Sequence, residues 1–152
     1  MEQILLTIAI LTTGIIYGTD VFFAIVGKKA SHMSDDSSIA DLLGHIHLVA
    51  DKRIPIIGIT SVISTSLFIF LIGINPISGK LAGMSLLFLL IHLTFYLSVA
   101  KPINKKMSSA AVRKITLHNI RILQNRWDSV ILYRAISLTI ALLLLVLSIT
   151  NL

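Results

Sequence analysis

The sequence contains no cysteine, which excludes disulfide bonds, thiolate metal sites and thiol catalysis. It is also poor in charge: Asp, Glu, Lys and Arg make up 13% of its 152 residues, whereas a soluble domain carries about 25%. Hydrophobic residues make up 55% of the chain, and the mean hydropathy is +0.92. This balance excludes an ordinary water-soluble protein and predicts a single membrane domain that covers residues 1–152.

Four apolar segments are each long enough to cross a bilayer as a helix. They cover residues 4–27, 54–74, 80–100 and 127–151. The first has neither a basic leader nor a small-residue cleavage site, so we expect it to be a retained helix. Two further segments, 38–53 and 108–126, are amphipathic or basic and are also expected to be helical. The sequence therefore predicts an all-α fold, an antiparallel bundle of four transmembrane helices.

The positions of the basic residues predict how this bundle is oriented. Four lysines and arginines lie between spans one and two, seven lie between spans three and four, and only Lys80 lies on the opposite side. Because connections rich in Lys and Arg stay in the cytoplasm, we expect both termini on the non-cytoplasmic face of the plasma membrane. Orientation and lipid-phosphate contact explain the net charge of +6. Since the basic segment 101–126 has no stacking aromatics, no nucleic-acid partner is expected.

The stretch G-H-I-H-L-V-A-D-K-R-I-P at 44–55 gathers more polar chemistry than any other part of the chain. In a helix, His47 and Asp51 are four residues apart and share a face, as an acid/base pair or two ligands of one group would. His45 points the other way, toward Asp41, and that face is expected to be solvated.

Away from the span ends, three acidic, basic or histidine side chains lie inside the predicted spans, where an ionisable residue costs about 2.5–3.5 kcal/mol on insertion scales. Asp20 is seven residues from the cytoplasmic end of its span, His92 eight and Arg134 seven. At about 1.5 Å per residue, all three lie roughly 10–13 Å below the cytoplasmic surface. We therefore expect Asp20 and Arg134 to form a buried ion pair, with His47 and Asp51 at the cytoplasmic edge of the same layer.

A cofactor is left open by these residues. A divalent metal would have to take its ligands from His47, Asp51, Asp20 and His92, and a bis-histidine haem would need His47 opposite His92. A ferritin-like di-iron site is disfavoured, because the sequence does not carry two copies of Glu-x-x-His. Trp127, at the start of the fourth span, is expected at the membrane interface.

Four stretches occur together in an order that resembles a known family. They are G-T-D-V-F-F-A-I-V-G at 18–27, G-H-I-H-L-V-A-D-K-R-I-P at 44–55, K-P-I-N-K-K-M at 101–107 and R-W-D-S-V-I-L-Y-R-A at 126–135. Over nearly the whole chain they resemble the anthrone oxygenase-like family of small four-helix membrane proteins. The resemblance implies oxidation of an anthrone to an anthraquinone without a bound flavin or haem. It also implies that the family pattern includes Asp20, His45, His47, Asp51, Arg53, Asn104, Trp127 and Arg134; His92 has no place on that pattern.

The leading hypothesis is a membrane oxidoreductase that acts on a lipophilic anthrone- or quinol-like aromatic. His47 with Asp51 would supply the base, Arg134 would stabilise an oxyanion, and Asp20 would complete the catalytic set. The other candidate substrate contacts are His45, Arg53, His92, Asn104 and Trp127.

Two alternatives stay open. One is a non-enzymatic bundle that binds a lipid or a partner protein, or a second copy, through the G-x-x-x-G face of Gly14 and Gly18. The other is a small proton-coupled transport subunit in which Asp20 and His92 relay the proton.

Overall fold

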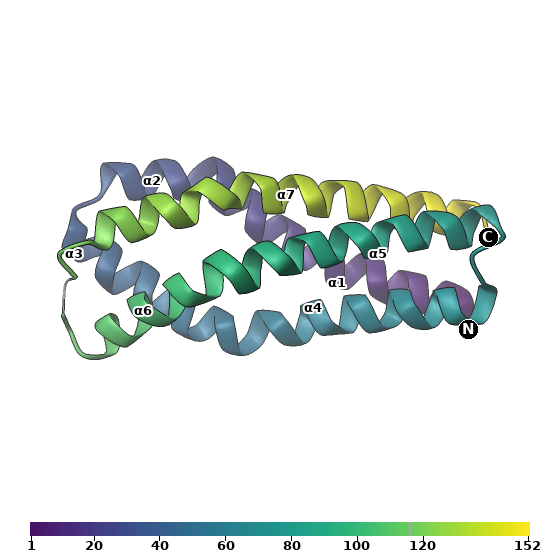
Figure 1. The fold of residues 1–152 in the computed structure, drawn as a ribbon, viewed down its shortest axis with the longest axis horizontal. Coiled ribbons are helices and arrows are strands. Elements are labelled where there is room, and N and C mark those ends of the chain that lie inside the picture. The colour runs from purple at the N-terminus through teal and green to yellow at the C-terminus, as the bar shows by residue number, and fades with distance from the viewer. Residues whose placement is uncertain (116) are drawn as a thin grey trace.

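The computed structural model describes residues 1–115 and 117–152, which form four long helical rods lying side by side (Figure 1). Rod one is α1 (Glu2–Phe22), the π-helical turn η1 (Phe23–Gly27) and α2 (Lys28–Met33). Rod two is α3 (Asp36–Ser38), η2 (Ile39–Leu43) and α4 (Gly44–Ile72). Rod three is α5 (Ile77–Phe95), η3 (Tyr96–Ala100) and α6 (Lys101–Val112). Rod four is α7 (Ile120–Thr150).

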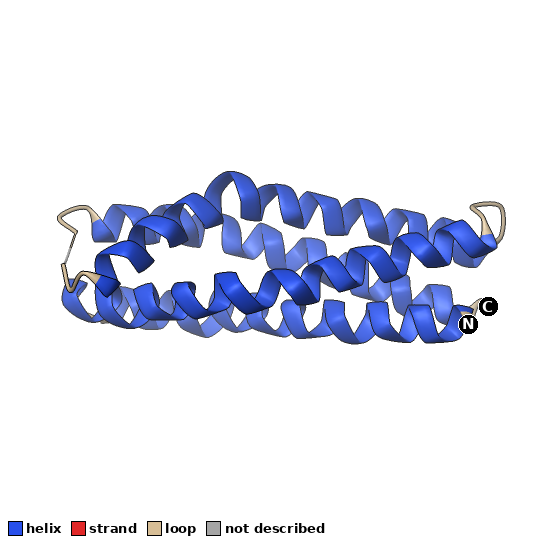
Figure 2. Cartoon of the chain, turned by 90° about the horizontal axis from the view of Figure 1, so that it is seen from below, coloured by secondary structure: helices blue, strands red, loops and turns tan. Residues whose placement is uncertain are grey.

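All four rods are long and apolar enough to cross a membrane, which confirms the predicted all-α class and the four-helix bundle. Short loops join the rods, and the described residues contain no strand (Figure 2). The N- and C-termini lie at one end of the bundle (Figure 1). The opposite end, where rod one meets rod two and rod three meets rod four, is called the loop end below.

The rods are longer than a bilayer requires. They contain 31 to 37 residues, which corresponds to about 46–56 Å of helix against a hydrocarbon core of about 30 Å. The excess lies at the loop end, because the polar residues of the chain gather there. The amphipathic segment 38–53 is accordingly the loop-end extension of rod two, continuous with its apolar span and with Pro55 inside α4.

The predicted helix over 108–126 is wrong, because the chain reverses inside it. α6 ends at Val112 and α7 begins at Ile120, and Thr116 lies outside the described residues. Lys114 has a φ of 55°; its N–H donates to the Ala111 carbonyl, and the Ile115 N–H donates to the Ala110 carbonyl. This is the Schellman arrangement that ends a helix, here with lysine where glycine is usual. Because no glycine marks this position, the residues alone do not indicate the turn.

Each of the first three rods contains one π-helical turn at or near the level where its polar residues gather. A π turn holds one residue more than an α turn, and such turns are frequent at functional sites. Between the first turn of α4 and α6 the backbones approach closely: a Cβ on Gly44 would lie 2.8 Å from the Met107 carbonyl oxygen and 2.5 Å from Ala111 Cβ. Glycine is therefore required there by contact with a neighbouring backbone.

Apolar side chains and hydroxyl groups hold the two ends of the bundle together. A cluster around Phe68 and Leu145 fills the terminal end, and another around Met107 and Ile120 fills the loop end. Across the rods, the Thr13 and Ser61 hydroxyls lie 2.6 Å apart. Ser85 donates to the Ala141 carbonyl at 2.8 Å, and Ser148 donates to the Ser78 carbonyl at 2.8 Å. Hydrogen bonds of this kind fix the register of helices in lipid.

The orientation of the bundle in the membrane stays a prediction, and the absence of native cysteine makes it easy to test. We expect cysteines introduced at Ser34 and Ser109, both at the loop end, to react with a membrane-impermeant maleimide only from the cytoplasmic side. A cysteine at Asn75, beside the termini, should react only from the other side. The unmodified chain is the blank, and labelling of Asn75 from the cytoplasm would invert the topology.

Candidate functional site

The predicted ion pair between rods one and four is present and has a third member. Arg134 Nη2 donates to Asp20 Oδ1 at 2.9 Å, and His92 Nε2 lies 3.1 Å from Asp20 Oδ2. Asp20 and Arg134 are 3% and 6% exposed. The matched depths expected from the sequence thus bring α1, α5 and α7 together at one carboxylate.

The partners of Asp20 determine which imidazole nitrogen carries the proton. A carboxylate only accepts, so we assign the proton to Nε2 of His92, which then donates to Asp20. The Arg134 nitrogens 3.4 Å from Nε2 are therefore contacts and not donors to it. This leaves Nδ1 with a lone pair, and no hydrogen bond among the described residues occupies it. With neutral His92 the cluster has no net charge, which suits a site of low dielectric constant.

Asp51 has a different set of partners from the one predicted. Its Oδ1 accepts a hydrogen bond from the Tyr96 hydroxyl at 3.1 Å and another from Asn104 Nδ2 at 2.8 Å. Both donors belong to rod three, one at the start of η3 and the other in α6. His47 and Asp51 share a helix face, as expected, but no hydrogen bond joins them.

His47 packs on the indole of Trp127, with ring centroids 5.4 Å apart and planes at 45°. Trp127 was expected at the membrane interface, but it is only 5% exposed and lies inside the bundle. It meets Phe23 edge-on at 5.4 Å, and the Arg134 guanidinium carbon lies 5.9 Å from its ring centre. Because α7 begins seven residues earlier, at Ile120, this position falls on the inward face of the loop-end part of α7.

These groups lie around one cavity of about 490 Å³ to which all four rods contribute. The predicted residues on its wall are Asp20, His47, Asp51, His92, Asn104, Trp127 and Arg134. The volume falls within the roughly 300–1,000 Å³ typical of small-molecule sites. Three buried polar atoms of its lining side chains have no hydrogen-bond partner among the described residues: His47 Nε2, Asn104 Oδ1 and Trp127 Nε1. An occupant with hydroxyl or carbonyl groups would offer partners to such atoms after a small side-chain adjustment.

Two predicted substrate contacts lie elsewhere. His45 is exposed, its Nδ1 is 2.8 Å from the Asp41 carbonyl oxygen, and it is 3.3 Å from the Asp41 carboxylate. Arg53 is exposed as well, and neither residue lines the cavity. The solvated face expected for His45 and Asp41 is therefore present, while a direct contact from His45 or Arg53 to an occupant is not supported by their position.

The predicted metal ligands are not gathered into one set. Among the described residues, no three His, Asp or Glu side chains lie close enough to share a metal ion. Asp20 and His92 pair with each other and with Arg134, whereas Asp51 bonds to Tyr96 and Asn104. A haem held by His47 and His92 stays a prediction.

Tyr96 is the residue that the sequence argument missed. The only indication in the sequence was that Tyr96 lies four residues after His92 and so shares its helix face. This spacing is common in any helix and does not by itself indicate a site. A second buried carboxylate was missed too: Asp128 is 2% exposed, accepts from Gln124 Nε2 at 2.9 Å and lies 3.5 Å from His32 Nε2. It belongs to the loop end and does not line the large cavity.

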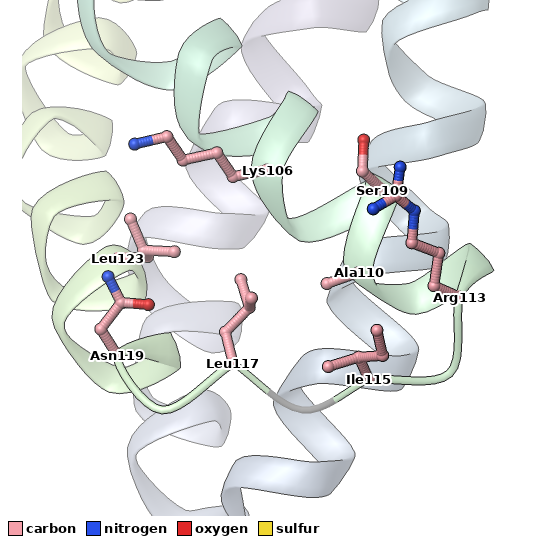
Figure 3. A pocket seen from close by; sticks show the side chains of 8 residues that line it. All are labelled: Lys106, Ser109, Ala110, Arg113, Ile115, Leu117, Asn119 and Leu123. Atoms are coloured by element: carbon pink, nitrogen blue, oxygen red, sulfur yellow. The ribbon is translucent and has the colours of Figure 1, made fainter.

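A smaller cavity of about 250 Å³ lies where the chain passes from α6 to α7 (Figure 3). Its wall is mostly apolar, with Lys106 and Arg113 at its edge, and none of the predicted site residues reaches it. The chemistry of the chain is therefore concentrated in the larger cavity.

Comparison of the chain with protein-family models, with curated proteins and with solved structures yields no match. The description of the cavity and its polar groups therefore rests on this structure alone, and the family resemblance stays a prediction.

Proposed function

We propose that the chain is a plasma-membrane oxidoreductase that binds a lipophilic anthrone- or quinol-like aromatic in the large cavity and oxidises it with dioxygen. The observation that carries this proposal is the buried cluster of Asp20, His92 and Arg134 on the wall of a cavity inside an apolar bundle. Placing an ionisable group inside a membrane span costs free energy, so such groups are candidates for a functional site. A base, the carboxylate that orients it and a fixed cation meet there within hydrogen-bond distance.

The arrangement supports His92 as the general base. Asp20 holds its Nε2–H and would stabilise the imidazolium, while the free Nδ1 is available to take a proton from a phenol or an acidic C–H group. Arg134 would balance the oxyanion that remains. His47 is less suited to the role given to it by the sequence, because its presumed partner Asp51 already accepts two hydrogen bonds from rod three.

Dioxygen is the only co-reactant for either ring. A quinol would give two hydrogens and their two electrons to dioxygen, which forms the quinone and hydrogen peroxide. An anthrone methylene loses two hydrogens and gains one oxygen atom to become a carbonyl, and the second oxygen atom leaves with those hydrogens as water. The protein removes the first proton and holds the anion; the four-electron reduction of dioxygen is matched by the oxidation of that carbon. Dioxygen is apolar and reaches the cavity through the bilayer.

Oxygen consumption tests the proposal. We expect the purified protein in phosphatidylcholine vesicles to consume one dioxygen per anthrone and to form the quinone, followed by its absorption, faster than empty vesicles do. An anaerobic sample should form none. Trp127 is the only tryptophan and lines the cavity, so its fluorescence reports binding separately. Fluorescence quenching without oxygen consumption would make the chain a binding protein. The absence of both quenching and oxygen consumption would refute the proposal.

Self-association stays a prediction alongside this function. A Cβ added at Gly14 or Gly18 would meet nothing within 4 Å, so this face is not used for close contact inside the bundle.

A further inference from the structure

The lining of the large cavity is sorted by polarity along the bundle axis. On α4 the polar His47 and Asp51 come first and apolar residues follow toward the terminal end, and on rod three Leu89 comes before the polar His92, Tyr96 and Asn104. On rod four Arg134 likewise lies nearer the loop end than Leu138, whereas on rod one Thr19 and Asp20 lie between the apolar Ile16 and Phe23. The apolar half is formed by Ile16, Ile54, Gly58, Val62, Leu89 and Leu138.

The cavity is also elongated. Its wall on rod two runs from Ile46 to Ile63, which is about 26 Å of helix. On rod three it runs from Leu89 to Asn104, about 22 Å. A rigid aromatic ring at the polar cluster leaves the apolar half of this length unfilled.

Between rods two and three the cavity lining reaches the outer surface of the bundle. α4 and α5 run side by side (Figure 1), and the residues that line the cavity between rods two and three include four that are themselves exposed, Ile59, Ile63, Leu93 and Leu97. We call this gap the lateral opening. Lys101 is exposed and lines the cavity toward the loop end. With its amine among the headgroups, as is usual for a lysine near the end of a membrane span, the lateral opening would lie in the hydrocarbon region.

We propose that the cavity is built for an amphiphile: a phenolic or quinol ring that carries an isoprenoid or alkyl tail and enters from the bilayer through the lateral opening. The ring lies among the polar residues near Trp127 and Asp20, and the tail lies along Gly58 and Val62 and leaves between α4 and α5. This deepens the proposed function by naming the form of the substrate, and it rests on that function only for the identity of the ring.

Gly58 offers a way to fill the tail groove. A Cβ there would lie 3.4 Å from Ile16 Cδ1, so a small addition is tolerated while a leucine would project into the apolar half. Gly83, on α5, is the matched control: it does not line the cavity, and a Cβ there meets nothing within 4 Å. Lipid is itself apolar, so tail length alone changes partitioning into the bilayer; only a comparison of variants with the same ligand isolates the groove.

The experiment measures Trp127 quenching in phosphatidylcholine vesicles by a dimethoxy-methylbenzoquinone with a decyl tail and by the same ring without one. We expect Gly58→Leu to raise the Kd of the tailed ring about tenfold, the factor that corresponds to a clash of roughly 1.4 kcal/mol. The Kd of the ring without a tail should stay within about twofold, and Gly83→Leu should change neither. If Gly58→Leu does not fold, Val62→Phe fills the same groove.

A photoreactive diazirine at the end of the tail gives an independent measurement. Its label should fall on the α4 segment 58–63 or the α5 segment 89–93. Equal effects of Gly58→Leu on both probes, no effect on either, or a label on the outer face of α1 would overturn the inference. These outcomes are distinct from a failure of the proposed function. Tail-dependent binding without oxygen consumption would refute only the oxidation. Oxidation of the ring that is unaffected by filling the groove would refute only the role of the tail.

Discussion

Replacing His92 by glutamine is expected to lower the rate of aromatic oxidation about 10²–10⁴-fold, the range that general-base catalysis contributes. Glutamine keeps an N–H for Asp20 but has no basic nitrogen, so the fold and the ion pair with Arg134 should survive. Oxygen uptake at saturating substrate measures the loss, and the thermal midpoint verifies that the protein remains folded.

Two other histidines calibrate this result. His45→Ala should leave the rate almost unchanged, since His45 is exposed and outside the cavity. The sequence hypothesis that His47 is the base predicts an inactive His47→Ala. The structure places His47 beside Trp127, where its loss should weaken binding more than chemistry. A nearly normal His92→Gln together with an inactive His47→Ala would return the base to His47.

The second large effect concerns stability. Asp20→Asn should lower the free energy of unfolding by about 3–5 kcal/mol, because it leaves Arg134 without its counter-charge inside the bundle. The double variant Asp20→Asn/Arg134→Gln should lose clearly less than the sum of its two single variants. Unfolding in mixed micelles with increasing dodecyl sulfate measures all three.

The ion pair between Asp36 and Arg121 is the control for this cycle. It has a shorter N–O distance, 2.6 Å, but its side chains are 51% and 36% exposed. Breaking it through Asp36→Asn should cost no more than about 1 kcal/mol, because water screens exposed charges. Strict additivity in the Asp20 and Arg134 cycle would show that these two residues do not interact.

The sequence could predict how deep each polar side chain lies along the helix axis. Asp20 and Arg134 were matched by counting residues from the cytoplasmic ends, and this works because every α-helical residue rises by the same 1.5 Å. The four spans were predictable for the same reason, since lipid thickness sets how long an apolar run must be.

The partners of Asp51 were not predictable, because they depend on rotation about the helix axis. The turn η3 (Tyr96–Ala100) separates His92 from Asn104 and inserts about one residue, which turns everything beyond it by roughly 100°. A regular helical wheel therefore gives the wrong face for α6. The reversal after Val112 was hidden in a similar way, since Lys114 adopts the left-handed conformation without a glycine to mark it.

The π-helical turns also bear on how this cavity can change as the gene changes. Each turn is a place where one codon can be lost and the segment can settle into a regular α-helix, with no new connection needed. Loss of one codon within 96–100 would rotate Lys101 and Asn104 away from the cavity while His92 and the terminal half of α5 stay where they are. The two halves of the cavity wall can thus change independently of each other. Short insertions or deletions at these turns can alter which polar groups meet the occupant, while the helix packing toward the terminal end is retained.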